Sequence, residues 1–103
     1  SHQAVAFMLA NLATDADAAR LLALQAASLK GAGLPFGKQA AMAKLWASEA
    51  ATQACNDSLQ IHGGYGYTRE FDVERHLRDA KLCEIGEGTS EVQRIVISRS
   101  VLR

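Results

Sequence analysis

The sequence predicts an all-α fold: a partial four-helix up-and-down bundle with two long antiparallel helices and shorter C-terminal helices. Two observations predict it. Apolar residues recur at helical spacing along most of the chain, and no stretch alternates apolar and polar residues as a half-buried strand does. The periodic stretches are separated by glycine- and proline-containing breaks, which mark the turns between helices.

Length and composition limit the classes of protein to consider. A chain of 103 residues is one domain and is expected to bury somewhat over ~60% of its unfolded surface. Eleven basic residues balance eleven acidic ones, which argues against a nucleic-acid partner, and no apolar run approaches the roughly 20 residues that span a bilayer. Cys55 and Cys83 form no close pair, which favours free thiols in a reducing cytoplasm.

The first residues, Ser1-His2-Gln3, lead directly into an amphipathic pattern without an initiator methionine. We therefore expect a piece of a longer protein, and three origins fit this start: a processed product, a cloned domain or the C-terminal portion of a larger chain.

The first helix is expected from His2 to about Lys30, where alanine fills most gaps between larger apolar residues. Those expected to face inward are Val5, Met8, Leu9, Leu12, Leu21, Leu22, Leu24 and Leu29. Gly31, Gly33 and Pro35 then end the helix, because proline cannot continue it and the residue before proline leaves the α region.

The second helix is expected from Phe36 or Gly37 to about His62. Its inward stripe comprises Met42, Leu45, Trp46, Ala50, Cys55 and Leu59. The polar residues between them are expected on the solvated face: Gln39, Ser48, Thr52, Asn56 and Asp57. Cys55 is expected to be a small buried apolar residue.

Three glycines in four positions end this helix within residues 60–68. The spacing is not a dinucleotide-binding fingerprint and no strand precedes it, so alone it fits either a ligand contact or a helix C-cap with an aromatic turn. A short charged helix follows over residues 70–80, with Val73, Leu77 and Ala80 on one face and a favourable Glu74–Arg78 pair.

Glu87 stands between Gly86 and Gly88, just before a predicted helix that starts at Thr89 and Ser90 and continues to Arg103. The flanking glycines allow unusual backbone conformations and close approach of a ligand, so the loop presents an acid. Alone, the pattern equally fits a glycine-rich helix start with a solvated glutamate. The last helix is expected to turn Val92, Ile95, Val96 and Val101 inward and Gln93, Arg94 and Arg99 outward.

Three stretches together resemble the C-terminal helical domain of the acyl-CoA dehydrogenases. They are Gln-Ile-His-Gly-Gly-Tyr-Gly-Tyr at 60–67, Glu-Arg followed by Arg-Asp-Ala-Lys at 74–81, and Ile-Gly-Glu-Gly-Thr-Ser-Glu-Val-Gln-Arg at 85–94. His2-Gln3 resembles the start of an earlier bundle helix, so the resemblance covers nearly the whole chain. It implies that residues 1–103 form the family's C-terminal domain without the N-terminal helical domain, the middle β domain and the first bundle helix.

The resemblance also implies FAD as cofactor, held between subunits of a tetramer. The residues that match flavin-contacting positions are His2, Gln3, Gln60, Ile61, His62, Gly63, Gly64, Thr89, Ser90 and Glu91. Gly88 and Arg99 match positions that contact the acyl-CoA thioester or its CoA portion.

Glu87 matches the family's catalytic base. The implied reaction is α,β-dehydrogenation of an acyl-CoA: the carboxylate removes a weakly acidic α-proton while the β-hydrogen leaves as hydride to flavin N5. Gly86 departs from the family, because many members carry tyrosine there, and this change suggests a larger pocket or a bulkier or branched substrate. His62 and His76 match no catalytic position, and the cysteines and histidines lack the spacing of a metal site.

The implied partners are an acyl-CoA, electron-transfer flavoprotein or a similar acceptor, and further copies of the subunit. The implied role is fatty acid β-oxidation, in a bacterial cytoplasm or a mitochondrial matrix. The 103 residues alone are expected to be inactive. A competing hypothesis is a non-catalytic helical module of the same fold that serves oligomerisation or interaction.

Overall fold

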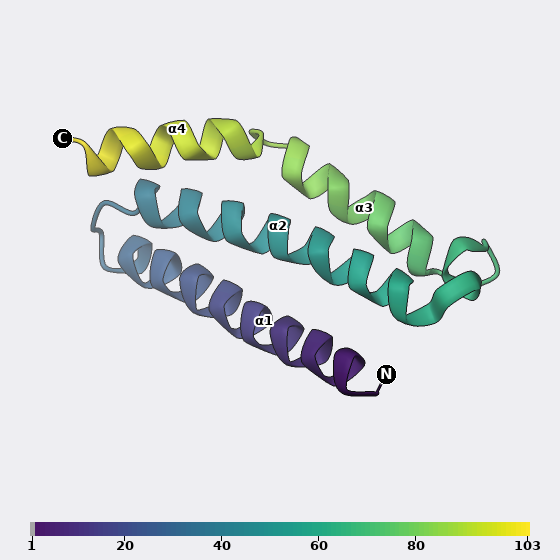
Figure 1. Cartoon of the computed structure of the whole chain (residues 1–103). Helices are drawn as coiled ribbons and strands as arrows, with labels where there is room; N and C mark the ends of the chain where they lie inside the picture. Colours follow the sequence, from purple (N-terminus) through teal and green to yellow (C-terminus); the bar gives the residue numbers. More distant parts are fainter. Residues whose placement is uncertain (1) are drawn as a thin grey trace.

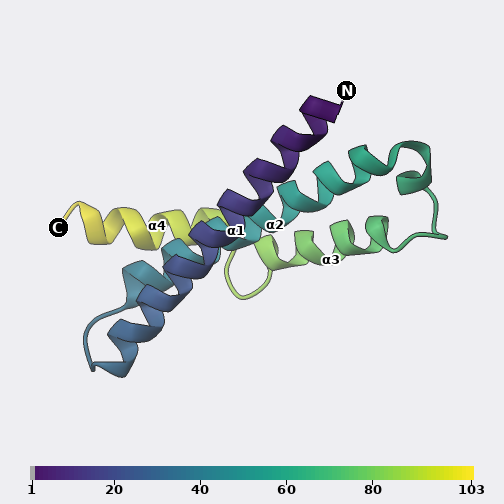
Figure 2. The same ribbon diagram turned by 90° about the horizontal axis from the view of Figure 1, so that it is seen from below.

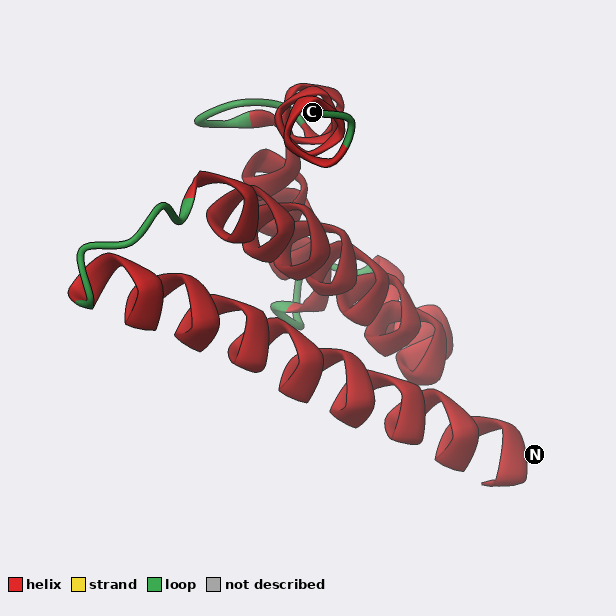
Figure 3. Cartoon of the chain, turned by 90° about the vertical axis from the view of Figure 1, so that its left-hand side faces the viewer, coloured by secondary structure: helices red, strands yellow, loops and turns green. Residues whose placement is uncertain are grey.

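The computed structural model describes the backbone of residues 2–103 and the side chains of residues 3–103. It consists of α1 (His2–Gly31), α2 (Gly37–His62), the 3₁₀ helix η1 (Gly63–Tyr67), α3 (Val73–Ile85) and α4 (Ser90–Val101). Figure 3 shows only helices and loops across these residues, so the predicted all-α fold is confirmed. The long helices end where the sequence predicts, whereas the short helix begins at Val73 and extends to Ile85, beyond its expected end.

Helix α2 is the centre of the arrangement. Figures 1 and 3 show α1 on one side of α2, running antiparallel to it, and the α3–α4 segment on the other side. Seen from below in Figure 2, α3 lies along the later half of α2. Alanine lets α1 and α2 approach closely: among the side chains of residues 3–103, the two that are apolar and buried, Ala26 and Ala41, come one from each of these helices.

The turn between α1 and α2 is closed by backbone hydrogen bonds. The Leu34 N–H donates to the Leu29 carbonyl at 2.9 Å, and Gly33 adopts a positive φ of 72°. Glycine accepts this left-handed conformation without the steric cost that a side chain would add. One further tie between the helices is the Trp46 indole N–H, which donates to the Asp15 carbonyl at 3.3 Å.

The core is smaller than the length predicts. The chain exposes 7347 Å², whereas a compact protein of this mass exposes roughly 5,600 Å². By the same scaling it buries roughly 54% of its unfolded surface, below the expected 60%. The radius of gyration is 16.0 Å, against roughly 13 Å for a compact domain of this length. The cause is the layered arrangement, in which only α2 is covered on two sides.

This exposure corrects several inward assignments. Leu9, Leu21, Leu24 and the Trp46 ring are exposed, because α2 covers only one face of α1 and Trp46 lies at the edge of their contact. On α4 the predicted face is wrong: Val92, Ile95, Val96 and Val101 are exposed. The face that α4 turns to the rest of the chain carries Ser90, Gln93 and Ile97 instead.

Of the five polar residues of α2 expected on the solvated face, four differ from expectation and only Asn56 is exposed. Ser48 is buried and Thr52 half-buried, since both lie on the face of α2 that α3 covers, and the Ser48 hydroxyl donates to the Lys44 carbonyl one turn earlier at 2.7 Å. Gln39 and Asp57 are half-buried as well. Cys55 is half-buried, and this partial burial raises the pKa of its thiol. On α3 the predicted face of Val73, Leu77 and Ala80 is confirmed, as is the Glu74–Arg78 pair, whose Oε2 and Nε lie 2.8 Å apart.

Candidate active site

The Glu87 loop, defined here as residues 86–89, joins the end of α3 to the start of α4. Gly86 is extended, with φ −69° and ψ 149°, and Gly88 has a positive φ of 106°. Thr89 is the N-cap of α4, and its hydroxyl accepts a hydrogen bond from the Val92 N–H at 3.2 Å. The predicted start of the last helix is therefore confirmed by a side-chain cap.

Glu87 itself adopts a left-handed backbone conformation, with φ 59°. Among residues 2–103 it is the one non-glycine residue with a positive φ. A side chain in this region costs about 1–2 kcal/mol, so the surrounding contacts must hold it there. The glycines predicted unusual backbone conformations in this loop, but they did not indicate that the glutamate itself would be left-handed.

The Glu87 side chain is exposed and lies at the wall of a groove of about 600 Å³ between α2 and α3. The groove is lined mainly by apolar and small residues: Lys44, Ala47, Ser48, Ala51, Leu82, Cys83, Gly86 and Glu87. Since Gly86 contributes no side chain, the groove is open directly beside the carboxylate. This arrangement places an acid against an apolar surface that a small organic group can contact.

Lys44 of α2 contacts both sides of the Glu87 loop. Its Nζ donates to the Cys83 carbonyl at 2.9 Å and to the Gly88 carbonyl at 2.6 Å. The Gln93 side-chain amide donates to the same Gly88 carbonyl at 3.4 Å. Sequence reasoning missed Lys44, because its partners are backbone atoms far along the chain. The one available signal was a lone cation within an otherwise alanine-rich stretch.

Glu84 forms a second connection between α2 and α3, one turn before the loop. Its Oε2 accepts a hydrogen bond from the Thr52 hydroxyl at 2.7 Å and lies 3.2 Å from the Lys81 Nζ. The Thr52 hydroxyl, together with the Lys81 and Lys44 ammonium groups, holds the pKa of Glu84 below its ordinary value, although partial burial acts in the opposite direction. Glu84 therefore serves to hold α3 against α2.

The residues predicted to contact flavin lie in separate places. Residues 60–64 occupy the end of α2 and the start of η1, where all five are exposed, and the His62 Nδ1 lies 2.7 Å from the Ser58 carbonyl oxygen. Thr89, Ser90 and Glu91 lie at the start of α4, beyond the whole length of α3 (Figure 1). Gln3 is exposed near the start of α1, and the His2 side chain lies outside the described residues.

Both regions have features that suit a ligand of FAD's kind. Side chains would meet nothing within 4 Å at Gly63 and Gly64, so their backbone is open to close approach. Ser90 is only 7% exposed, and its hydroxyl makes no hydrogen bond within the described part of the chain. One buried polar atom at the start of α4 is therefore left without a hydrogen-bond partner among the described residues.

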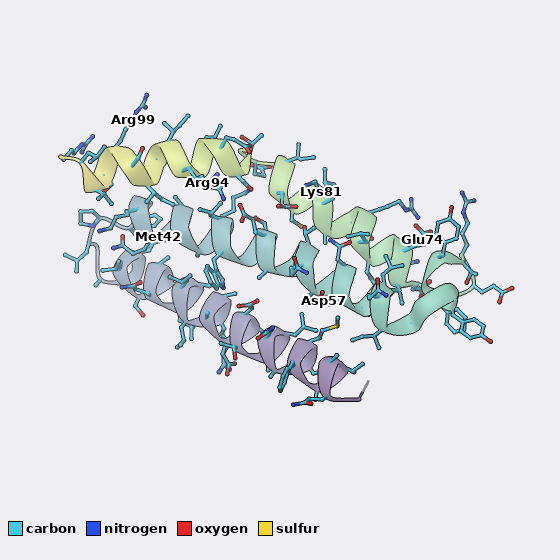
Figure 4. The ribbon with its side chains drawn as sticks, in the orientation of Figure 1. Met42, Asp57, Glu74, Lys81, Arg94 and Arg99 are labelled. Atoms are coloured by element: carbon cyan, nitrogen blue, oxygen red, sulfur yellow. The ribbon has the colours of Figure 1, made fainter. Side chains whose placement is uncertain are left out.

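The two residues predicted to bind substrate are also separated. Gly88 lies in the Glu87 loop, whereas Arg99 is eleven residues further, roughly 16 Å along a helix axis. Figure 4 shows Arg99 pointing away from α2, while Arg94 points towards it. Arg94 pairs with Glu49 of α2 at 2.6 Å and lines a second groove of about 630 Å³, together with Met42 and Trp46.

Two kinds of feature were looked for among residues 2–103: a metal-binding cluster and a membrane-spanning helix. No cluster of three or more His, Cys, Asp or Glu side chains within it can hold a metal ion. Within the same residues, no helix is both long and apolar enough to cross a bilayer.

The family of this chain follows from its sequence similarity to known protein families. The sequence model of the family described as acyl-CoA dehydrogenase, C-terminal domain, matches residues 1–102. The chain belongs to the acyl-CoA dehydrogenase family. The resemblance seen in the sequence is thereby confirmed.

Individual relatives agree with this assignment. The chain is 60% identical over 103 residues to the probable acyl-CoA dehydrogenase YngJ of Bacillus subtilis, covering 100% of this chain and 27% of that protein. It is 54% identical over 101 residues to the human mitochondrial short-chain specific acyl-CoA dehydrogenase, covering 98% of this chain and 24% of that protein. The chain thus spans about a quarter of each relative.

A solved structure supports the fold in the same way. The butyryl-CoA dehydrogenase of Megasphaera elsdenii superposes with a TM-score of 0.94 at 46% identity, over 98% of this chain and 26% of that one. The helical arrangement of residues 2–103 is therefore that of the family's C-terminal domain.

Proposed function

We propose that this chain is the part of an FAD-dependent acyl-CoA dehydrogenase that supplies the catalytic base, Glu87. The observation that carries the proposal is the geometry of the loop: Glu87 is left-handed, stands between glycines and lines an apolar groove. The membership of the chain in the family supports the same assignment. The complete subunit, of which this chain would be about a quarter, would perform α,β-dehydrogenation of an acyl-CoA thioester.

Glu87 would act on the α-proton of the thioester. A carboxylate can accept this proton only when the α-carbon lies within hydrogen-bonding reach, so the substrate must approach the loop closely. Gly86 and Gly88 make that approach possible because neither adds a side chain beside the carboxylate. The small residues along the groove wall, Ala47 and Ala51, would leave room for the acyl group.

The cofactor would be held by residues of both separated regions. The exposed glycine turn at residues 60–64 and the start of α4, with Thr89, Ser90 and Glu91, would both contact FAD. The resemblance implies an FAD held between subunits of a tetramer, so these contacts would be to a neighbouring subunit's cofactor. His2 and Gln3 would join these contacts. When bound, FAD supplies the acceptor for the hydride that leaves the β-carbon.

The CoA portion would lie along α4, where Gly88 and Arg99 bracket the helix. The exposed guanidinium of Arg99 is suited to a phosphate group of CoA. Electron-transfer flavoprotein or a similar acceptor would reoxidise the enzyme, within the β-oxidation of fatty acids in a bacterial cytoplasm or a mitochondrial matrix.

The test is turnover of a panel of acyl-CoA substrates by the complete subunit with an artificial electron acceptor. We expect turnover by the wild-type subunit and by a Glu70→Gln control, which removes an exposed carboxylate outside the site. Glu87→Gln is expected to retain the yellow flavin and lose turnover. Turnover of no acyl-CoA by a fully FAD-loaded wild-type subunit would instead favour the non-catalytic helical module.

A further inference from the structure

The Lys44 ammonium occupies an unusual position for a lysine. It is half-buried on α2, and it donates to two backbone carbonyl groups that belong to different elements. The Cys83 carbonyl lies in the last turns of α3, and the Gly88 carbonyl follows Glu87 directly. Lys44 therefore bridges the two ends of the segment that presents the carboxylate.

The hydrogen bonds explain how a strained residue is held. Glu87 is in a left-handed conformation, which a glutamate does not adopt without support. The peptide group between Gly88 and Thr89 is fixed through its carbonyl, which accepts from Lys44 at 2.6 Å and from Gln93 at 3.4 Å. Hydrogen bonds from an ammonium are charge-assisted and stronger than those from the neutral Gln93 amide. Lys44 is thus the principal restraint on this carbonyl.

We propose that Lys44 is a positioning residue for Glu87, fixing the loop so that the carboxylate points into the groove between α2 and α3. This inference rests on the proposed function, because it assigns Lys44 a role only if Glu87 is the base. Lys44 also lines the same groove as Glu87, so the residue that holds the loop and the carboxylate that the loop presents lie at one site.

The test compares Lys44→Met in the complete, FAD-loaded subunit with Lys38→Met as control. Lys38 lies on the same helix, roughly 9 Å nearer its start, and is not bonded to the loop. For Lys44→Met we expect kcat to fall roughly 10- to 100-fold while KM changes little, because a misplaced base slows chemistry more than binding. We expect a larger isotope effect with an α-deuterated acyl-CoA.

A second readout does not depend on turnover. Amide hydrogen exchange of residues 84–90 should become faster in Lys44→Met and stay unchanged in Lys38→Met, since the loop loses its restraint. Lys44→Arg keeps the cation but not the compact ammonium, so its kcat should fall between those of the wild type and Lys44→Met. This conservative variant gives the answer if Lys44→Met does not fold.

The outcomes separate the two proposals. A folded, FAD-loaded Lys44→Met or Lys44→Arg with wild-type kcat, isotope effect and exchange would overturn the role of Lys44. If Glu87→Gln abolishes turnover in the same assay, the proposed function stands even then. If Glu87→Gln retains turnover, the proposed function fails, and the role of Lys44 fails with it.

Discussion

Thr52 donates its hydroxyl to the Glu84 carboxylate at 2.7 Å, and this bond joins α2 to the last turn of α3. The bond lies three residues before Glu87, so it anchors the helix end from which the candidate base projects. It also satisfies a carboxylate whose side chain is only 15% exposed. Its loss would leave a partly buried charge with fewer donors.

Thr52→Val should therefore destabilise the protein by about 1–2 kcal/mol, since it keeps the shape of the side chain and removes the donor. Urea unfolding measures the change. Thr14→Val is the matched control, because the Thr14 hydroxyl donates only to the Ala10 carbonyl on its own exposed helix. An equal loss in both variants would show that the Thr52–Glu84 bond contributes nothing specific.

The stability that Glu84 contributes should depend on pH. Its pKa is lowered in the folded state, first by the Thr52 hydroxyl and then by the nearby ammonium groups. The contribution is therefore fully present above the unfolded pKa of about 4.3 and is lost as pH falls through the lower folded pKa. The difference in unfolding midpoint between wild type and Glu84→Gln should be large at pH 6 and shrink towards pH 3. A difference that is constant or grows as the pH falls would contradict this.

Gly66 is predicted to tolerate no side chain. It is buried in η1, and an added Cβ would lie 2.6 Å from the Leu59 carbonyl oxygen and 2.9 Å from the Leu59 Cδ2. Because the first of these is a backbone atom, the clash cannot be relieved by a rotamer change. Gly66→Ala should cost about 1–3 kcal/mol in thermal or urea unfolding. Gly64→Ala, which meets open space, should leave stability unchanged; equal effects would refute the packing argument.

The left-handed Glu87 predicts an order of stability between two variants that lack its carboxylate. Glu87→Gly removes the carboxylate and the backbone strain, whereas Glu87→Ala removes only the carboxylate. Glycine also has more conformational entropy in the unfolded chain, which offsets part of the gain from the relieved strain. Glu87→Gly should therefore be the more stable variant by roughly 0.5–1 kcal/mol. Calorimetry of the two variants checks this. A more stable Glu87→Ala would mean that the loop is not left-handed at this position.

The sequence predicted the bounds of the two long helices well because these depend on local chemistry, whereas the short helix expected over residues 70–80 spans Val73–Ile85. Helix α1 ends at Gly31, Gly33 and Pro35 whichever of its faces is buried, and Thr89 caps α4 with its own side chain. The inward faces were harder. Helix α4 carries apolar residues on more than one side, and the side that meets the rest of the chain, with Gln93 and Ile97, follows from the position of α2.

Only part of the geometry of the candidate site could be predicted from the sequence. The position of Glu87 between glycines was visible in the sequence, but the contacts that hold it were not. Lys44 donates to carbonyl groups 39 and 44 residues away. Every residue has a backbone carbonyl, so the residue types do not show which carbonyl groups accept from a lysine. Ser48 and Thr52 were expected in solvent because they are polar, whereas they lie on the face of α2 that α3 covers.

The most direct test of the central claim is exchange of the substrate's α-hydrogen with solvent. The complete, FAD-loaded subunit is incubated with an acyl-CoA in D₂O, and deuterium at the α-carbon is measured by mass spectrometry. The wild type should exchange the α-hydrogen, and Glu87→Gln should do so at least about 10²-fold more slowly. Exchange by Glu87→Gln at the wild-type rate, with FAD still bound, would show that another group removes the proton.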